Sequence, residues 1–225
     1  MPAPKIIAID GPAASGKSTL GFRLAESLGY LFFDTGLMYR AITWLALNRG
    51  VAMKDEAAIT QLAQDVPIEV SPPSLEDGRV CDVVVDGLDI TGEMTRPEID
   101  ANVSTVAAYP GVRTALTIQQ RRIGMRGRVV MVGRDIGTVV LPEADLKLYL
   151  DASPEQRARR RHKESVARGG RASYQEVLAK VVERDRIDST RAVAPLVAAQ
   201  DAVILDTDQL NADQAFEKAY DLCVK

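Results

Sequence analysis

The sequence predicts an α/β fold in which a five-stranded parallel sheet is flanked by helices. Five short apolar runs lack the polar alternation of half-exposed strands, which is typical of a parallel sheet buried on both faces. Stretches with helical periodicity separate these runs, and this alternation favours a doubly wound arrangement. One region breaks the rhythm and predicts a small antiparallel insertion. A doubly wound sheet is expected to bind its ligand at the carboxyl ends of its strands.

The expected elements follow one another along the chain. The strands are residues 6–10, 30–33, 129–132, 146–150 and 203–205. The helices are residues 17–28, 35–48, 111–125, 153–168, 173–188 and 212–222. Gly29 follows the first helix and is suited to a left-handed C-cap. Helix 153–168 opens with Ser153 as a cap and Pro154 at the first helical position.

Residues 66–95 form the predicted insertion. Strand-like runs at 68–70, 80–85 and 88–90 are separated by Ser71-Pro72-Pro73 and by the turn Asp86-Gly87. An Asp-Gly pair between apolar runs is typical of a tight hairpin. We therefore expect a core domain made of residues 1–65 and 96–225, with a helical lid at about 153–172, and a β insertion at 66–95.

Composition is that of an ordinary globular protein. The chain has 225 residues, of which 46% are hydrophobic, and no apolar run is long enough to cross a bilayer. Cys81 and Cys223 are isolated, and only His162 could join them as a ligand, so neither a disulfide framework nor a zinc site is expected. We expect a cytoplasmic protein with no secretion signal and no membrane partner.

Positive charge is concentrated in one segment. The net charge is −3, yet residues 157–191 hold eleven Lys or Arg against five Asp or Glu. A basic segment on an acidic protein predicts a locally held polyanion. Tyr174 is the only Phe, Trp or Tyr in this segment, whereas RNA-binding arms interleave basic and aromatic residues, so no nucleic-acid partner is expected.

A glycine-rich loop follows the first predicted strand and opens the first predicted helix. It has the G-x-x-x-x-G-K-S form of a phosphate-binding loop, or P-loop, whose backbone N–H groups surround a phosphate chain. The expected ATP-binding residues are Gly11, Pro12, Ala13, Ala14, Ser15, Gly16, Lys17, Ser18 and Thr19. Lys17 would reach the outer phosphates and the Ser18 hydroxyl would bind Mg²⁺. A plain connecting turn is the alternative.

The P-loop alone leaves the reaction open, because GTPases, ATPases and small-molecule kinases all use one. The sequence has no Asn-Lys-x-Asp motif for reading guanine, which argues against a switch GTPase. The run at 129–132 ends in Gly133-Arg134-Asp135 rather than in a carboxylate pair, which argues against a large ATPase. A P-loop kinase is the leading hypothesis.

A second anion site is predicted beside the P-loop. Asp34-Thr35-Gly36 follows the second strand, and Thr35 is expected to cap the helix that carries Arg40. Arg134 and Asp135 follow another strand and should meet them at the same sheet edge. A simple cap and turn is the alternative reading at Thr35.

These motifs together resemble the bacterial cytidylate kinases. The resemblance rests on the P-loop and on three further segments: Asp34-Thr35-Gly36-x-x-Tyr39-Arg40, Gly133-Arg134-Asp135-Ile136-Gly137-Thr138-Val139-Val140, and Glu183-Arg184-Asp185 leading to Arg191-Ala192-Val193-Ala194-Pro195-Leu196. It covers essentially the full chain. Two small departures are Thr35, which stands where serine is common, and the middle residue of Asn102-Val103-Ser104. It implies a monomeric enzyme that transfers the γ-phosphoryl group of ATP to CMP, and usually to dCMP, with Mg²⁺.

The resemblance also implies residue roles. The implied catalytic residues are Lys17, Arg134, Arg157 and Arg161. The implied substrate-binding residues are Thr35, Arg40, Ser104, Arg113, Arg134, Asp135, Arg184, Asp188 and Arg191. No general base is needed, because a phosphate acceptor with a second pKa near ~6 is already an anion at neutral pH. Asp135 would face the cytosine amino group, with Arg113 and Ser104 assisting, and Asp188 with Arg184 would hold the ribose.

Other readings stay open at this point. Arg157, Arg160 and Arg161 share a helix face, which is either a lid over the phosphates or a solvated basic surface. Arg184 and Asp188, at i and i+4, can form a plain helical ion pair. Ser104 and Arg113 can be surface residues. The protein could phosphorylate another small acceptor, or act as a nucleotide-binding regulator that contacts a partner through its insertion.

Overall fold

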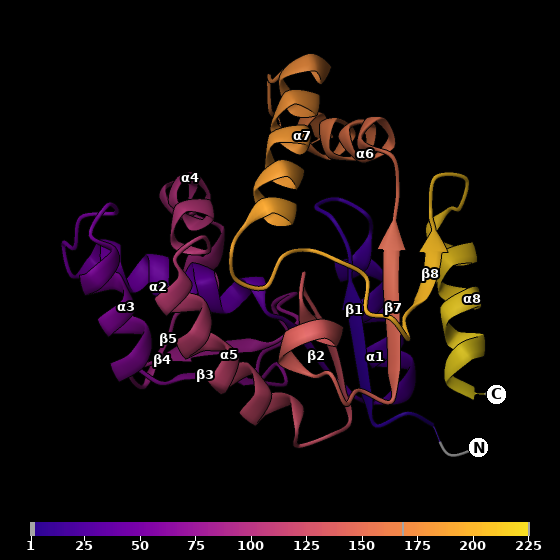
Figure 1. Cartoon of the computed structure of the whole chain (residues 1–225), viewed down its shortest axis with the longest axis horizontal. Helices are drawn as coiled ribbons and strands as arrows, with labels where there is room; N and C mark the ends of the chain where they lie inside the picture. The colour runs from indigo at the N-terminus through magenta and orange to yellow at the C-terminus, as the bar shows by residue number, and fades with distance from the viewer. Residues whose placement is uncertain (1–2, 168, 225) are drawn as a thin grey trace.

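The five-stranded parallel sheet is confirmed. In a computed structural model of the protein, residues 3–167 and 169–224 are described, and the strand order is β2-β6-β1-β7-β8 (Figure 1). The strands are β1 (Ile6–Asp10), β2 (Leu31–Asp34), β6 (Val129–Val132), β7 (Leu146–Asp151) and β8 (Val203–Asp206). All pairings in this sheet are parallel. The chain builds outward from β1 in both directions, so the carboxyl end of β1 lies at the switch point where such sheets bind ligands.

Helices cover both faces of the sheet because the central strands β1 and β6 are apolar on both sides. On one face, Ile7 and Ile9 pack with α1 (Lys17–Leu28) and α8 (Ala212–Val224). On the other, Ala8 and Met131 share a core with α2 (Gly36–Asn48) and α5 (Pro110–Gly124). Gly29 takes the left-handed conformation and ends α1 as expected.

β8 departs from the expected two-sided burial. Leu205 packs against α8, but Val203 and Ile204 are exposed. β8 is the last strand of the sheet and pairs only with β7, so part of its surface has no covering helix among the described residues.

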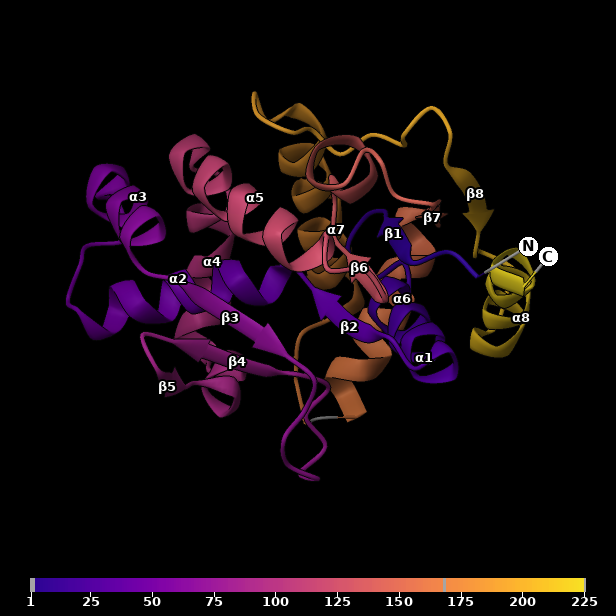
Figure 2. The same cartoon turned by 90° about the horizontal axis from the view of Figure 1, so that it is seen from below.

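The antiparallel insertion is also present. β3 (Ile68–Ser71), β4 (Asp82–Val85) and β5 (Leu88–Asp89) form a three-stranded sheet. Asp86 and Gly87 both have positive φ, at 53° and 78°, as a tight hairpin turn requires. The buried side chains of β3 and β4 belong to the same core as α2 and α5, so this sheet packs onto the larger unit (Figure 2). A domain division at residues 66 and 95 stays a prediction.

Two helices near the insertion are missing from the sequence prediction. α3 (Glu56–Asp65) is short, and its only buried residues are Ile59 and Ala63, so its periodicity is weak. It begins at an Asp55 cap, whose carboxylate accepts a hydrogen bond from Ala58 N at 3.0 Å. α4 (Pro97–Val106) follows a 3₁₀ turn, η1 (Thr91–Thr95), and a single π-helical turn, η2 (Ile136–Val140), follows β6.

α6 (Pro154–Ala167) and α7 (Tyr174–Thr190) lie beyond the carboxyl end of β7 (Figure 1). The predicted starts are confirmed: Pro154 is the first residue of α6, and Ser173 forms a capping box with Glu176 ahead of α7. The expected end of α6 at Arg168 falls outside the described residues. None of the helices in the described ranges combines the length and hydropathy that a membrane crossing needs.

Candidate active site

The P-loop has the backbone that a phosphate cradle needs. Gly11 has φ of 143°, and a Cβ there would collide with the carbonyl of Leu150 in β7. Gly16 and Ala14 also have positive φ, at 94° and 61°. The alanine is notable, because non-glycine residues rarely adopt this region without a local reason. The loop therefore turns back on itself and enters α1 at Lys17.

Lys17 is buried at the base of this loop. Its Nζ donates to Pro12 O at 2.6 Å and to Ser15 Oγ at 3.4 Å. Burial and the nearby Arg134 lower the pKa of Lys17 well below its usual value, and the carboxylates of Asp34, Asp10 and Asp188 oppose this. An ammonium group has three N–H donors, so these contacts leave one for a ligand.

Ser18 and Asp34 form an oxygen pair beside Lys17. Ser18 Oγ donates to Asp34 Oδ2 at 2.8 Å, and Asp34 Oδ1 accepts from Gly36 N at 3.0 Å. Asp34 is missing from the predicted site, although its position at the end of β2 could have identified it. Hydroxyl and carboxylate oxygens suit Mg²⁺, which proteins usually hold with one or two such groups and the phosphates of a substrate.

The expected side-chain cap at Thr35 is wrong. Thr35 takes the N-cap position of α2, but its hydroxyl makes no cap and donates instead to Val132 O, at 3.0 Å. Asp34 meets the first free N–H of α2 in its place. Thr35 is buried and fixes the end of β6, which leads directly into Arg134.

A pocket of about 560 Å³ lies against the P-loop, with α6 and the segment before α8 as its other walls. Arg161 is exposed and lines this pocket. Arg160 also lines it but donates to the hydroxyl and carbonyl oxygens of Thr207. The pocket therefore offers one exposed guanidinium next to the P-loop.

Arg157 is not on the pocket side of α6. It is buried, and its Nη atoms form a bidentate pair with Asp185 of α7, at 2.9 and 2.5 Å. It also donates to Ala13 O of the P-loop at 3.2 Å and to Ala152 O at 2.8 Å. Arg157, Arg160 and Arg161 lie on one helix as the spacing predicts, but each has different polar contacts, and their role as a lid over the phosphates stays a prediction. Asp185, which was not predicted, ties α7 to the P-loop through Arg157.

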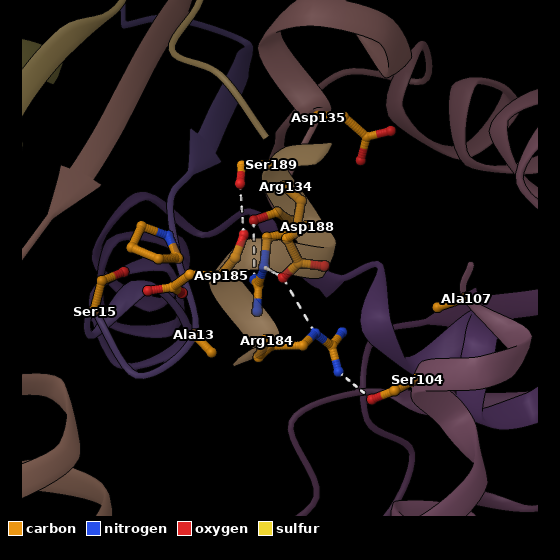
Figure 3. Close-up of polar contacts among 12 residues, drawn as sticks. Ala13, Ser15, Ser104, Ala107, Arg134, Asp135, Arg184, Asp185, Asp188 and Ser189 are labelled. Atoms are coloured by element: carbon orange, nitrogen blue, oxygen red, sulfur yellow. Dashed lines mark hydrogen bonds and ion pairs between the residues drawn. The ribbon is translucent and has the colours of Figure 1, made fainter. Parts of the chain in front are cut away.

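The predicted acceptor residues converge on two buried carboxylates. We call Arg113, Arg134, Arg184 and Arg191, together with Asp135 and Asp188, the arginine cluster. Asp188 Oδ2 accepts from Arg134 Nε at 2.9 Å and from Arg184 Nε at 3.1 Å (Figure 3). Arg191 lies 3.5 Å from the other oxygen of Asp188. Burial raises the pKa of Asp188, but the three guanidinium groups outweigh it and hold the pKa below its usual value.

Asp135 is the second carboxylate of the arginine cluster. Its Oδ2 accepts from Arg113 Nη2 at 2.5 Å, and Arg191 lies 3.7 Å from Oδ1. Burial and the charge of Arg113 lower the pKa of Arg191, against the opposing effect of Asp135 and Asp188. The alternative that Arg113 is a surface residue is excluded, because it is only 3% exposed.

The arginine cluster has more positive than negative charge. Four guanidinium groups share two carboxylates, and among the described residues Arg113 Nε and Arg191 Nη2 have no hydrogen-bond partner although both atoms are buried. Buried donors without partners are unfavourable. The arrangement is suited to an added anion with several acceptor atoms.

Ser104 reaches the arginine cluster, but Arg40 does not contact it. Arg184 donates to Ser104 Oγ, so α7 is joined to α4 across the site (Figure 3). Arg40 donates to Met94 O at 2.8 Å and pairs with Asp100 at 2.6 Å. Arg184 and Asp188 form the i, i+4 ion pair that was one alternative for them, and this pair also lies among the predicted substrate-binding residues.

Fold and site together define a P-loop kinase: a P-loop at the switch point of a five-stranded parallel sheet, with a second cationic site beside it. A solved structure of an uncharacterized protein from Eubacterium ventriosum covers 97% of each chain with a TM-score of 0.54 and 11% identity, which supports the fold. A shikimate kinase from Bacteroides thetaiotaomicron aligns over 96% of each chain with a TM-score of 0.49 and 12% identity.

Sequence comparison gives the family. Residues 7–225 match the family model of cytidylate kinase. A cytidylate kinase of Roseiflexus castenholzii is 50% identical over 215 residues, covering 95% of this chain and 91% of the relative. One from Anoxybacillus flavithermus is 46% identical over 213 residues, with 94% and 92% covered. The chain belongs to the cytidylate kinase family, and the predicted resemblance is confirmed. Neither alternative function is favoured by these relatives.

Proposed function

We propose that the protein transfers the γ-phosphoryl group of ATP to CMP, and to dCMP, in the presence of Mg²⁺, giving CDP or dCDP and ADP. The observation that carries the proposal is the arginine cluster, whose surplus positive charge lies beside the P-loop in a chain of the cytidylate kinase family. Two anion sites at one sheet edge are what a reaction between two phosphate-bearing substrates needs.

The acceptor phosphate binds to arginines. Arg134 and Arg191 would hold it, since both guanidinium groups already converge on Asp188 and a guanidinium can bind two phosphate oxygens at once. Arg40 would join them only after leaving Asp100. Thr35 acts beside this site by holding the end of β6. No residue needs to remove a proton, because the monophosphate is already an anion.

Asp135 reads the base. Cytosine has an amino group at position 4, where uracil has a carbonyl oxygen, so a carboxylate facing that position accepts a hydrogen bond from cytosine and repels uracil. Arg113 holds Asp135 at 2.5 Å and has a free Nε for the ring acceptors. Ser104 assists, and Arg184 with Asp188 grips the ribose hydroxyls.

The donor half of the site binds ATP. Residues 11–19 cradle its phosphates, and Lys17 and Arg134 meet the transferred group. Ser18, with Asp34 beside it, would hold Mg²⁺, which neutralises charge on the phosphates when it is bound. Arg161 faces the P-loop pocket and would contact the migrating phosphoryl group. Arg157 contributes by bracing the loop at Ala13.

We further propose that the enzyme acts as a cytoplasmic monomer with small nucleotides as its only partners. Both cysteines are free and buried, as in proteins of a reducing compartment. Size-exclusion chromatography with light scattering measures the oligomeric state, and a mass near 24.4 kDa is expected.

A coupled assay of ADP release tests the function. The purified protein is given MgATP and, in separate reactions, CMP, dCMP, UMP, AMP or GMP. We expect CMP and dCMP to give the highest kcat/KM, with no turnover when Mg²⁺ is removed by chelation. Faster turnover of UMP or AMP would refute the assignment of the base site while leaving a kinase. ATP hydrolysis that no monophosphate stimulates would refute the kinase itself.

A further inference from the structure

Asp10 is a buried carboxylate to which the proposed reaction gives no role. It is the last residue of β1, it is only 4% exposed, and Gly11 of the P-loop follows it directly. Its Oδ1 accepts from Ile136 N at 2.8 Å and its Oδ2 accepts from Gly137 N at 2.7 Å. Each carboxylate oxygen thus holds one of two successive backbone amides on a different segment of the chain.

These two amides open the π-helical turn η2, immediately after Arg134 and Asp135. The turn closes on itself through Asp135 O, which accepts from Val139 N and Val140 N at 2.9 and 3.0 Å. Only Asp10 ties the start of the turn to β1 through a side chain of the described residues. The backbone on which Asp135 stands is therefore positioned by a carboxylate that belongs to the donor side of the site.

Burying the Asp10 carboxylate is energetically unfavourable, and strand pairing alone does not need a carboxylate at this position. The pKa of Asp10 is raised to about 6, because burial and the negative charge of Asp135 raise it more than the two amides and Lys17 lower it. A buried carboxylate is unfavourable unless its charge is hydrogen-bonded. Position 10 also pairs with Tyr149 in β7, which any strand-forming residue could do, and its charge opposes the lowering of the Lys17 pKa. The hydrogen bonds to the backbone amides of Ile136 and Gly137 explain why a carboxylate stands at this position.

We propose that Asp10 is a positioning residue for the acceptor half of the site: its carboxylate clamps residues 136 and 137 so that Arg134 and Asp135 face CMP at the correct distance from the P-loop. The inference rests on the proposed function, because it assigns Asp10 an effect on the choice and binding of the acceptor. It predicts that loss of the clamp changes CMP binding and base selection more than ATP binding.

Asp10→Asn is the sharpest variant. An amide keeps the size of the side chain but has a single acceptor oxygen, and its NH₂ group would face one of the two backbone N–H donors. One of the two clamping bonds is then lost. We expect KM for CMP to rise about tenfold and the ratio of kcat/KM for CMP over UMP to fall about as much, with KM for ATP within about twofold of wild type.

Asp145→Asn is the matched control. Asp145 Oδ2 accepts from Lys5 N at 2.8 Å and from Ile6 N at 2.9 Å, so it clamps two successive amides at the opposite end of the same strand, away from the site. We expect this variant to keep the wild-type KM values and the wild-type CMP to UMP ratio. Because both of its bonds end on one oxygen, Asp145→Asn can keep them, and this variant reports the effect of losing a carboxylate charge at a strand end outside the site.

A second variant covers the case in which Asp10→Asn does not fold. A Cβ at Gly137 would lie 3.1 Å from Lys147 Cδ, which is a tight contact, and 3.4 Å from Asp10 Oδ2, so Gly137→Ala crowds the start of η2 against the Lys147 side chain next to the clamp and keeps the charge. It should raise KM for CMP severalfold with the same split between substrates.

The outcomes separate the two proposals. If wild type does not prefer CMP, the proposed function fails. If wild type prefers CMP but Asp10→Asn and Gly137→Ala leave KM for CMP and the base preference unchanged, the positioning role is refuted. Equal rises in KM for ATP and for CMP would also refute it, since Asp10 would then act through the P-loop.

Discussion

The P-loop and the arginine cluster lie at the same sheet edge but are built in different ways. The P-loop is one contiguous segment whose shape comes from backbone conformation at Gly11, Ala14 and Gly16. The arginine cluster takes its side chains from β6, α5 and α7 and from the residues that follow them, and charge pairing on Asp135 and Asp188 holds them together. The phosphate chain of the donor is the same in every reaction and is bound by backbone groups. The acceptor must be distinguished from other monophosphates and is bound by side chains.

This difference predicts a division of labour. A change in the P-loop should affect every acceptor equally, because it acts on the donor. A change in the arginine cluster should separate acceptors from one another, or acceptor from donor.

Lys17→Ala should abolish phosphoryl transfer to every acceptor, because Lys17 belongs to the P-loop half of the site. Lys17 is buried against Pro12 O, and its ammonium would stabilise charge on the transferred group. We expect kcat to fall about 10³-fold with every monophosphate, in the coupled ADP-release assay. Lys218→Ala, on an exposed position of α8, is the control and should be silent. A loss confined to CMP would contradict the division.

Arg191→Lys should damage the acceptor half alone. The change keeps the charge but removes the planar fork that can bind two phosphate oxygens. We expect kcat/KM for CMP to fall about a hundredfold while KM for ATP is unchanged. Arg186→Lys is the control, because Arg186 is an exposed residue of α7 paired with Glu183. If both variants retain full activity, Arg191 does not hold the acceptor.

The pH dependence of the free energy of unfolding should reveal the raised pKa of Asp10, whose carboxylate joins the P-loop strand to the turn beside the arginine cluster. Its pKa is raised to about 6, because burial and the charge of Asp135 outweigh the two backbone amides and Lys17, and Tyr149 of β7 is a further titratable group that interacts with it. The folded protein therefore binds this proton more tightly than the unfolded chain, so wild type loses stability relative to Asp10→Asn as pH rises from about 4 to 6.

Urea unfolding of both proteins between pH 4.5 and 7.5 measures this effect. The stability of the variant minus that of wild type should grow by about 2 kcal/mol over this range and then level off. A difference independent of pH would show that Asp10 has an ordinary pKa.

The sequence predicts the P-loop half almost completely, because its signal lies in one segment between a strand and a helix. The arginine cluster was reached through family resemblance, since its members are distant in sequence and each alone could be a surface residue. Asp10 and Asp185 are missing from the sequence prediction, because the contacts that show their importance, with η2 and with Arg157, join segments that are distant in the sequence. The side-chain cap expected at Thr35 is wrong, because only tertiary packing decides which carbonyl oxygen a hydroxyl meets.

Asp135→Asn provides the most direct test of the division between the two halves. The amide has the same shape as the carboxylate and presents both a donor and an acceptor, so it should no longer repel uracil. We measure kcat/KM for CMP and UMP at saturating MgATP. We predict a fall in the CMP to UMP ratio of about tenfold, with KM for ATP unchanged. An unchanged ratio, or an equal loss with both monophosphates, would contradict the account.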